Sequence, residues 1–148
     1  MPSKTHPPSA ATARNVRWLF RSNALINWTV SLPGLISPAA TALAYGGIEP
    51  NYPSVIRLWQ GFVFMFGCMF WEVSRDVRGK AALIKYNWIE KTITATVLTW
   101  GYARGDIPSR LMLLIVFTNW AWIPFIIWAQ VALQRENTGI RAVDGSAA

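Results

Sequence analysis

Two ionisable residues, Glu90 and Lys91, stand inside an otherwise apolar run, KYNWIEKTITATVLTW, at residues 85–100. A charge in hydrocarbon is costly, so such a residue faces a bundle interior, pairs with another group or marks a functional site. Asn87 and Thr94 share a helical face with Glu90. Two interpretations stay open. Glu90 either donates or accepts a proton in a polar cavity, or lies in a buried hydrogen-bond network that holds helices together.

Other polar residues could complete a site around Glu90. Asn119 lies near the middle of the last apolar run, where it could face Glu90 across the bundle interior. Lys91 points about 100° away from Glu90 around the helix, so it needs its own partner or water. The predicted catalytic residues are Glu90, Asn119 and Asp76, and the predicted ligand-binding residues are Asn87, Thr94, Trp120, Glu72 and Lys91.

Glu72 and Asp76 lie four residues apart at the end of the second apolar run, on one helical face. Two carboxylates at this spacing could share a proton or hold a cation. Arg75, Arg78 and Lys80 offer ion pairs to the same carboxylates, and that arrangement is the more common one. We therefore expect ion pairing here, with the site interpretation left open.

Single residues exclude several classes of site. Cys68 is the only cysteine, so the chain forms no internal disulfide and no cysteine-based metal site. His6 is the only histidine, which argues against histidine-ligated metal, haem and a histidine-dependent triad. Glycine-rich phosphate-binding loops are also missing from the sequence. No cofactor is predicted.

Composition indicates a membrane protein. Of the 148 residues, 53% are hydrophobic and 14% are charged, against about 25% charged in a typical soluble domain. A bilayer core needs roughly 20 mainly apolar residues. Four runs meet this length, at residues 24–45, 53–73, 83–102 and 111–133. Because the connections are short, we expect an all-α polytopic membrane protein, an up-down four-helix transmembrane bundle.

The predicted transmembrane domain covers residues 22–134, between disordered tails at 1–21 and 135–148. Ten basic residues lie on one side of the spans and three on the other. The ten are Lys4, Arg14, Arg17, Arg21, Arg75, Arg78, Lys80, Lys85, Arg135 and Arg141, and the three are Arg57, Arg104 and Arg110. The positive-inside rule then predicts that both termini lie in the cytoplasm.

The net charge of +7 would also suit nucleic acid. The basic residues, however, form no stripe interleaved with base-stacking aromatics, so nucleic acid is not an expected partner. The expected partners are the lipid bilayer and an apolar small molecule or another membrane protein, and a homo-oligomer stays open.

The first apolar run has a second interpretation. Residues 1–23 are basic and free of acidic residues, and SPAATALA at residues 37–44 offers small-x-small cleavage sites. This pattern is typical of a secretory signal, so removal of residues 1–44 stays an alternative to a retained span. Prolines also predict two helix kinks, one near Gly34 between Pro33 and Pro38, and one at Pro124.

The run from WEVSRD through IEK, GDIP and NWAWIPF resembles a pattern in small four-helix bacterial inner-membrane proteins that are loosely DoxX-like. The matching pairs are Arg75 and Asp76, Glu90 and Lys91, Gly105 and Pro108, and Asn119 and Trp120. This chain has Val77 where the pattern has proline and Asn119 where it has an acid, which weakens a two-carboxylate mechanism. The resemblance implies the four-helix fold and a location in the bacterial inner membrane. Some DoxX-like proteins act beside quinone or thiol redox systems, and a single cysteine argues against direct thiol redox here.

The predicted function is that of an accessory bundle, or one that binds an apolar ligand such as a lipid, quinone or isoprenoid. The alternative is a small intramembrane isomerase or cyclase of a hydrophobic substrate. In that enzyme Glu90 would be the general acid, Asn119 and Trp120 would position the substrate, and Lys91 or Asp76 would tune the acid. Whether the protein is an enzyme stays open.

Overall fold

The computed structural model describes residues 10–47 and 51–144, and this part of the chain is helical without strands. The long helices are α1 (Ala10–Ile36), α3 (Pro53–Arg75), α4 (Ile84–Ala103) and α6 (Ile123–Asp144). The shorter elements are α2 (Pro38–Ala44), η1 (Ala81–Leu83), α5 (Ser109–Ile115) and the π-helical turn η2 (Val116–Trp120). The all-α prediction is confirmed.

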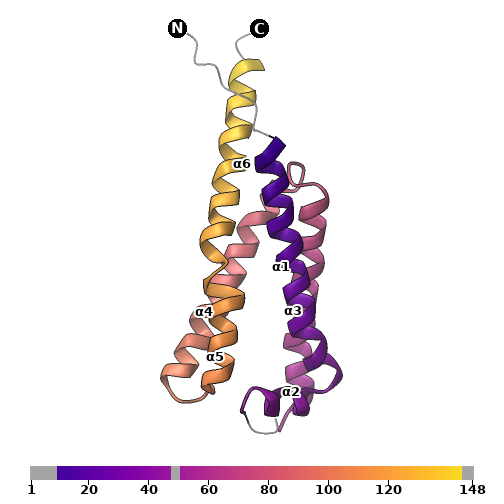
Figure 1. The fold of residues 1–148 in the computed structure, drawn as a ribbon, viewed down its shortest axis with the longest axis vertical. Helices are drawn as coiled ribbons and strands as arrows, with labels where there is room; N and C mark the ends of the chain where they lie inside the picture. The colour runs from indigo at the N-terminus through magenta and orange to yellow at the C-terminus, as the bar shows by residue number, and fades with distance from the viewer. Residues whose placement is uncertain (1–9, 48–50, 145–148) are drawn as a thin grey trace.

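The helices form two groups that converge at one end (Figure 1). α1 packs along α3, while α4 packs against α5, η2 and α6. The start of α1, η1 and the end of α6 lie at what we call the terminal end. α2 and the turn at residues 104–108 lie at the opposite, or far, end. α1 and α4 therefore run in the same direction.

The apolar core occupies the half of the bundle nearer the terminal end. Its fully buried side chains include Val16, Phe20, Phe70 and Ile126. The Phe20 and Phe70 rings meet edge to face, with centroids 6.3 Å apart. Burial of these large side chains joins α1, α3 and α6 at this end, and each contributes about 1.5–3 kcal/mol relative to an exposed position.

Both predicted tails are shorter than expected. Residues 10–21 begin α1, and Val16 and Phe20 are part of the core. Basic and small residues dominate the composition of this segment and conceal its apolar helical face. At the other end, α6 continues to Asp144, so the predicted tail at residues 135–148 is helical over most of its length. The remaining residues of both predicted tails lie outside the described part of the chain.

Glycine allows close contact between α1 and α3. A Cβ at position 67 would lie 2.6 Å from Nε1 of Trp28, because the indole ring of α1 covers this glycine. Small residues that let two helix backbones approach are typical of helix contacts in membranes. Trp28 also packs against Trp71, with ring centroids 5.7 Å apart. The ring therefore has little room to move aside.

We predict that Gly67→Ala lowers the free energy of unfolding by about 1–3 kcal/mol, because the added methyl group overpacks the contact with Trp28. Gly61→Ala on the same helix is the matched control, since a Cβ there would meet none of the described atoms within 4 Å. That control should gain up to about 1 kcal/mol from helix propensity. Unfolding followed by circular dichroism in detergent measures both, and equal stabilities would contradict the packing argument.

Prolines interrupt two helices. α1 continues through Pro33 and Gly34 and stops at Ile36, so the break lies at Ser37, directly before Pro38 and three residues past Gly34. Before Pro124, the Ala121 N–H donates to the carbonyl of Val116 at 3.0 Å, five residues back. Pro124 has no N–H for the carbonyl four residues before it, which favours this wider turn and a break there. The predicted interruption at Pro124 is present.

Among the described residues, two helical segments are long and apolar enough to cross a membrane, Pro53–Arg75 and Ser109–Arg135. Polar residues, such as Asn27 in α1 and Glu90 in α4, lower the mean hydropathy of the other long helices. The outer surface is nonetheless rich in large apolar side chains. Ile36, Phe117 and Trp100 are 77%, 69% and 68% exposed.

Candidate functional site

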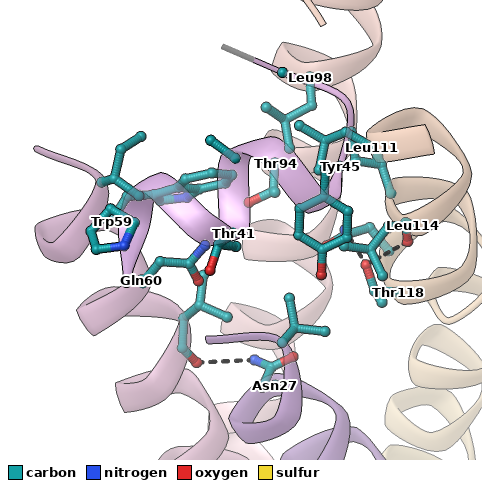
Figure 2. A pocket seen from close by; sticks show the side chains of 18 of the residues that line it. Asn27, Thr41, Tyr45, Trp59, Gln60, Thr94, Leu98, Leu111, Leu114 and Thr118 are labelled. Atoms are coloured by element: carbon teal, nitrogen blue, oxygen red, sulfur yellow. Dashed lines mark hydrogen bonds between the residues drawn. The ribbon is translucent and has the colours of Figure 1, made fainter. Parts of the chain in front are cut away.

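A cavity of about 170 Å³ lies between the two helix groups, in the half of the bundle nearer the far end (Figure 2). Its walls are mostly apolar and come from α1, α2, α3, α4 and α5; they include Val30, Ile56, Leu98, Leu111 and Leu114. Gly47 and Pro108 line it at the far-end turns. A cavity of this size is slightly larger than the roughly 150 Å³ apolar cavity that holds benzene in a protein core.

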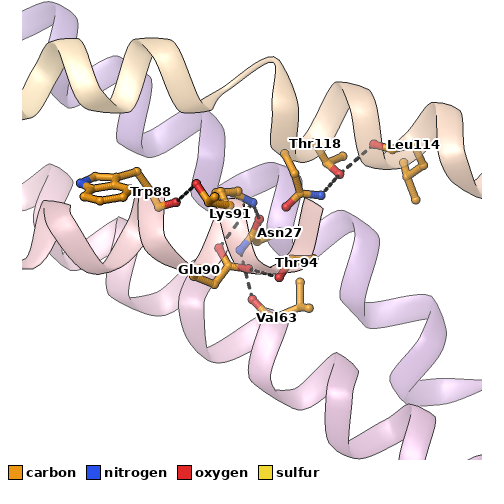
Figure 3. A network of polar contacts seen from close by, with 10 residues as sticks. Asn27, Val63, Trp88, Glu90, Lys91, Thr94, Leu114 and Thr118 are labelled. Carbon is orange, nitrogen blue, oxygen red and sulfur yellow. Dashed lines mark hydrogen bonds and ion pairs between the residues drawn. The ribbon is translucent and has the colours of Figure 1, made fainter. Parts of the chain in front are cut away.

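The floor of the cavity is polar. Asn27, Glu90 and Lys91 line it at the level where the apolar core begins. Lys91 is 2% exposed, and its ammonium group donates to Oδ1 of Asn27 at 3.0 Å (Figure 3). The amide of Asn27 in turn donates to the carbonyl of Val63 at 3.3 Å. This chain of contacts links α4 to α1 and α1 to α3, so it ties the two helix groups together.

Glu90 turns inward, with 11% of its side chain exposed. The Thr94 hydroxyl donates to Oε1 at 3.3 Å, and Nζ of Lys91 lies 4.0 Å from Oε2. Within the described part of the chain, Oε2 is buried without a hydrogen-bond partner. The cation beside this oxygen offsets part of its desolvation cost but leaves its lone pairs unused.

Lys91 has the hydrogen-bond partner that the sequence predicted for a lysine inside an apolar helix. Besides Asn27, its ammonium group lies 5.7 Å from the centre of the Phe70 ring, a cation–π distance. Asn27 is a site residue that the sequence interpretation missed. Its signal was the series Asn23, Asn27 and Ser31, spaced by four along the first apolar run, and all three side chains are buried.

Asn119 reaches the same cavity from η2. It is 6% exposed, and its amide donates to Thr118, whose hydroxyl donates to the carbonyl of Leu114 at 2.8 Å. The π-helical turn changes which residues face inward, and such turns are frequent at functional sites. The structure thus places Glu90, Lys91, Thr94 and Asn119 on one cavity.

Gln60 is a second wall residue that the sequence interpretation passed over. It is 7% exposed and packs across Gly34, where an added Cβ would lie 2.6 Å from Cγ of Gln60. Its Oε1 is buried and has no partner among residues 10–47 and 51–144. The available signal in the sequence was a glutamine within an apolar run, three residues after Arg57.

Asn87 does not line the cavity. It lies one helical turn from Lys91 toward the terminal end, fully buried. Asn23 lies one turn from Asn27 in the same direction on the parallel helix α1, and it is also fully buried. Of the described residues, none bonds to either carboxamide. The two asparagines extend the polar floor into the core.

Besides Asn87, three predicted site residues lie away from the cavity, and these are Trp120, Glu72 and Asp76. The indole N–H of Trp120 donates to Oγ1 of Thr99 at 3.1 Å, and the ring is 40% exposed, outside the cavity. Glu72 accepts from Lys80 at 2.5 Å and from Arg75 at 3.3 Å at the terminal end. The predicted ion pairing thus holds for Glu72.

Asp76 also lies at the terminal end, where its Oδ1 accepts from the Gly79 N–H at 2.9 Å. It therefore holds the turn after α3 and is too far away to tune Glu90. In the described residues, no group of three histidine, cysteine, aspartate or glutamate side chains could hold a metal ion. The cavity offers a buried carboxyl, an ammonium and several amides to an apolar guest.

No family model, curated protein or solved structure shows a significant match to this chain. The resemblance to small DoxX-like proteins stays a prediction. The function of the cavity therefore rests on its geometry alone.

Proposed function

We propose that this protein is an integral membrane bundle that binds one apolar molecule in the cavity between its two helix groups. The observation that carries the proposal is the cavity itself, whose walls are mostly apolar and whose charged groups, Glu90 and Lys91, lie together with Asn27 at the floor. Pockets for small ligands have this composition, apolar area with a few placed polar groups. Lipids, quinones and isoprenoids are the matching ligand classes.

The membrane part of the proposal has two supports. Two helical segments among the described residues are long and apolar enough to cross a bilayer. Large exposed apolar side chains such as Leu58, Leu113 and Phe125 continue around the outside, 59–63% exposed, and soluble monomers rarely present so much apolar surface. In the proposed arrangement α3, α4 and the α5–α6 segment span the bilayer together with α1.

The orientation follows from charge. Arg14 and Arg17 belong to the first part of α1 and Arg78 to the turn between α3 and η1, at the terminal end. Arg104 directly follows α4 and Arg110 lies in the first turn of α5, at the far end. By the positive-inside rule the terminal end faces the cytoplasm of a bacterial inner membrane. The cavity then belongs to the outer half of the bilayer.

We predict that the protein purified in mild detergent carries an apolar molecule at close to one per chain. Organic extraction and mass spectrometry identify and count this molecule, and bulk membrane lipid extracted from a control membrane protein gives the background. Intact-protein mass in the same sample tests whether residues 1–44 are retained, as the Lys91 bond to Asn27 in α1 requires. Recovery of only background lipid would contradict the binding function.

An enzymatic function is the second candidate, and the unpartnered Oε2 of Glu90 at an apolar cavity favours it. A carboxyl group in this position could protonate a hydrophobic substrate as a general acid. Glu90→Gln keeps the shape and removes the acidity, so an isomerase or cyclase would lose turnover while staying folded. Turnover assays on the molecule recovered by extraction, compared for both proteins, decide between the candidates.

A further inference from the structure

Two buried acceptor atoms at the cavity lack donors. Oε2 of Glu90 in α4 and Oε1 of Gln60 in α3 are both buried on cavity-lining residues, and neither accepts a hydrogen bond from a described residue, although Nζ of Lys91 lies 4.0 Å from the Glu90 oxygen. An acceptor left unpaired in a low-dielectric site has given up its hydrogen bonds to water without replacing them, which is unfavourable. Two such atoms around one cavity therefore favour a guest that supplies hydrogen-bond donors.

The other polar groups around the cavity largely bond to one another. Lys91 donates to Asn27, and Asn27 donates to the carbonyl of Val63. Thr94 donates to Glu90, and Asn119 donates to Thr118. Among the buried side-chain nitrogen and oxygen atoms of the lining residues, the two without a hydrogen-bond partner in the described chain are both oxygens, so the buried part of the cavity lacks a donor.

The two acceptors lie close to the same depth on facing helices. Val63 in α3 is level with Asn27, to which it is bonded, and hence with Lys91. Gln60 precedes Val63 by three residues, which places it roughly 4.5 Å nearer the far end at 1.5 Å per residue. Glu90 adjoins Lys91 at the floor. A donor group resting on the floor thus meets Glu90 below it and Gln60 on the wall.

We propose that the ligand is an amphiphile whose hydroxyl-bearing head rests against Glu90 and Gln60, with its apolar tail extending toward Gly47 and Pro108. This inference rests on the proposed function and names the class of ligand. A long-chain alcohol, an isoprenoid alcohol or a quinol carries the required O–H. A quinone, an ether or a hydrocarbon does not. The cavity of about 170 Å³ accommodates a head of about one ring, so a longer tail continues beyond it.

Matched probes test the proposal on the purified full-length chain. Displacement of tritiated 1-dodecanol by unlabelled 1-dodecanol and by dodecyl methyl ether compares two chains that differ only in the donor. A second pair, decylhydroquinone and decylquinone under anaerobic conditions, tests a ring-shaped head. We expect the O–H member of at least one pair to bind at least about tenfold more tightly than its partner, because hydrogen bonds to charged groups are the stronger ones.

Three variants test which residues cause the tighter binding of the O–H probe. Glu90→Gln should reduce the ratio to below about threefold, because a carboxamide can turn its N–H₂ toward an acceptor head. Gln60→Met removes the second acceptor at similar volume and should also reduce the ratio, which keeps the test valid if Glu90→Gln folds poorly. Glu72→Gln, the same change in an ion pair at the terminal end, should leave the ratio as in the unmodified protein.

The outcomes separate the two proposals. Equal affinity for the O–H probe and its partner in both pairs would overturn the donor-head inference and leave apolar binding intact. Failure of all four probes to bind would overturn the binding function as well. If both Glu90→Gln and Gln60→Met still bind the O–H probe more tightly than its partner, Glu90 and Gln60 do not recognise the head group, and the proposal is overturned.

Discussion

Lys91→Met should lower the free energy of unfolding by about 3–5 kcal/mol, since removing one partner of a buried charge pair leaves the other uncompensated. Lys91 is 2% exposed, and it is the cation 4.0 Å from the buried carboxyl of Glu90. The substitution also removes the donor to Asn27, which connects α4 to α1. Methionine fills a similar volume, so the loss reflects charge and hydrogen bonding more than packing.

A double-mutant cycle separates these contributions. Glu90→Gln combined with Lys91→Met removes both charges, and we expect it to recover more than half of the lost stability. Lys85→Met is the matched control, because Lys85 on the same helix is exposed and stacks on Tyr86, 4.9 Å from its ring. It should change stability by less than about 1 kcal/mol. Unfolding by SDS titration measures the unmodified protein, both single variants, the double variant and the control, and a Lys91→Met variant as stable as the control would refute the charge-pair argument.

The inward position of Glu90 was predictable, because an ionisable side chain costs more free energy in contact with hydrocarbon than in the interior of a helix bundle. The same reasoning required a partner for Lys91, but it could not identify Asn27. That bond joins two residues 64 positions apart in the chain, and it depends on the register between the parallel helices α1 and α4. Periodicity within one helix fixes the face of a residue and carries no information on which residue of another helix faces it.

The errors have a related origin. Composition predicted a disordered tail up to residue 21, yet Val16 and Phe20 fit the core because α3 and α6 supply apolar partners. Glu72 and Asp76 were candidates because of their spacing, but spacing alone does not place them near Glu90, and the turn after α3 satisfies both. A residue whose polar atoms are paired with neighbours in the same turn is a poor prediction for a ligand-binding site. Glu90 and Gln60 each keep one buried oxygen without a hydrogen-bond donor among the described residues, and both residues line the cavity.

Ala42→Phe should weaken binding of the apolar molecule, with a Kd raised at least about tenfold, which corresponds to about 1.4 kcal/mol or more. Ala42 in α2 lines the cavity near the far end. A phenyl ring occupies about as much space as the benzene that fills a cavity of roughly 150 Å³. One ring therefore takes most of the 170 Å³ available here.

Ala44→Phe makes the same change two residues later on α2, where the side chain is exposed and does not belong to the cavity lining. This control should keep the bound molecule. A ligand that binds only the folded state stabilises it by mass action, so added ligand should raise the melting temperature of Ala44→Phe and leave that of Ala42→Phe unchanged. Unchanged helicity in both proteins would show that the block acts on the cavity. Equal ligand content in the two variants would instead place the bound molecule on the outer surface, where an apolar guest needs neither the floor at Glu90 nor the walls around it.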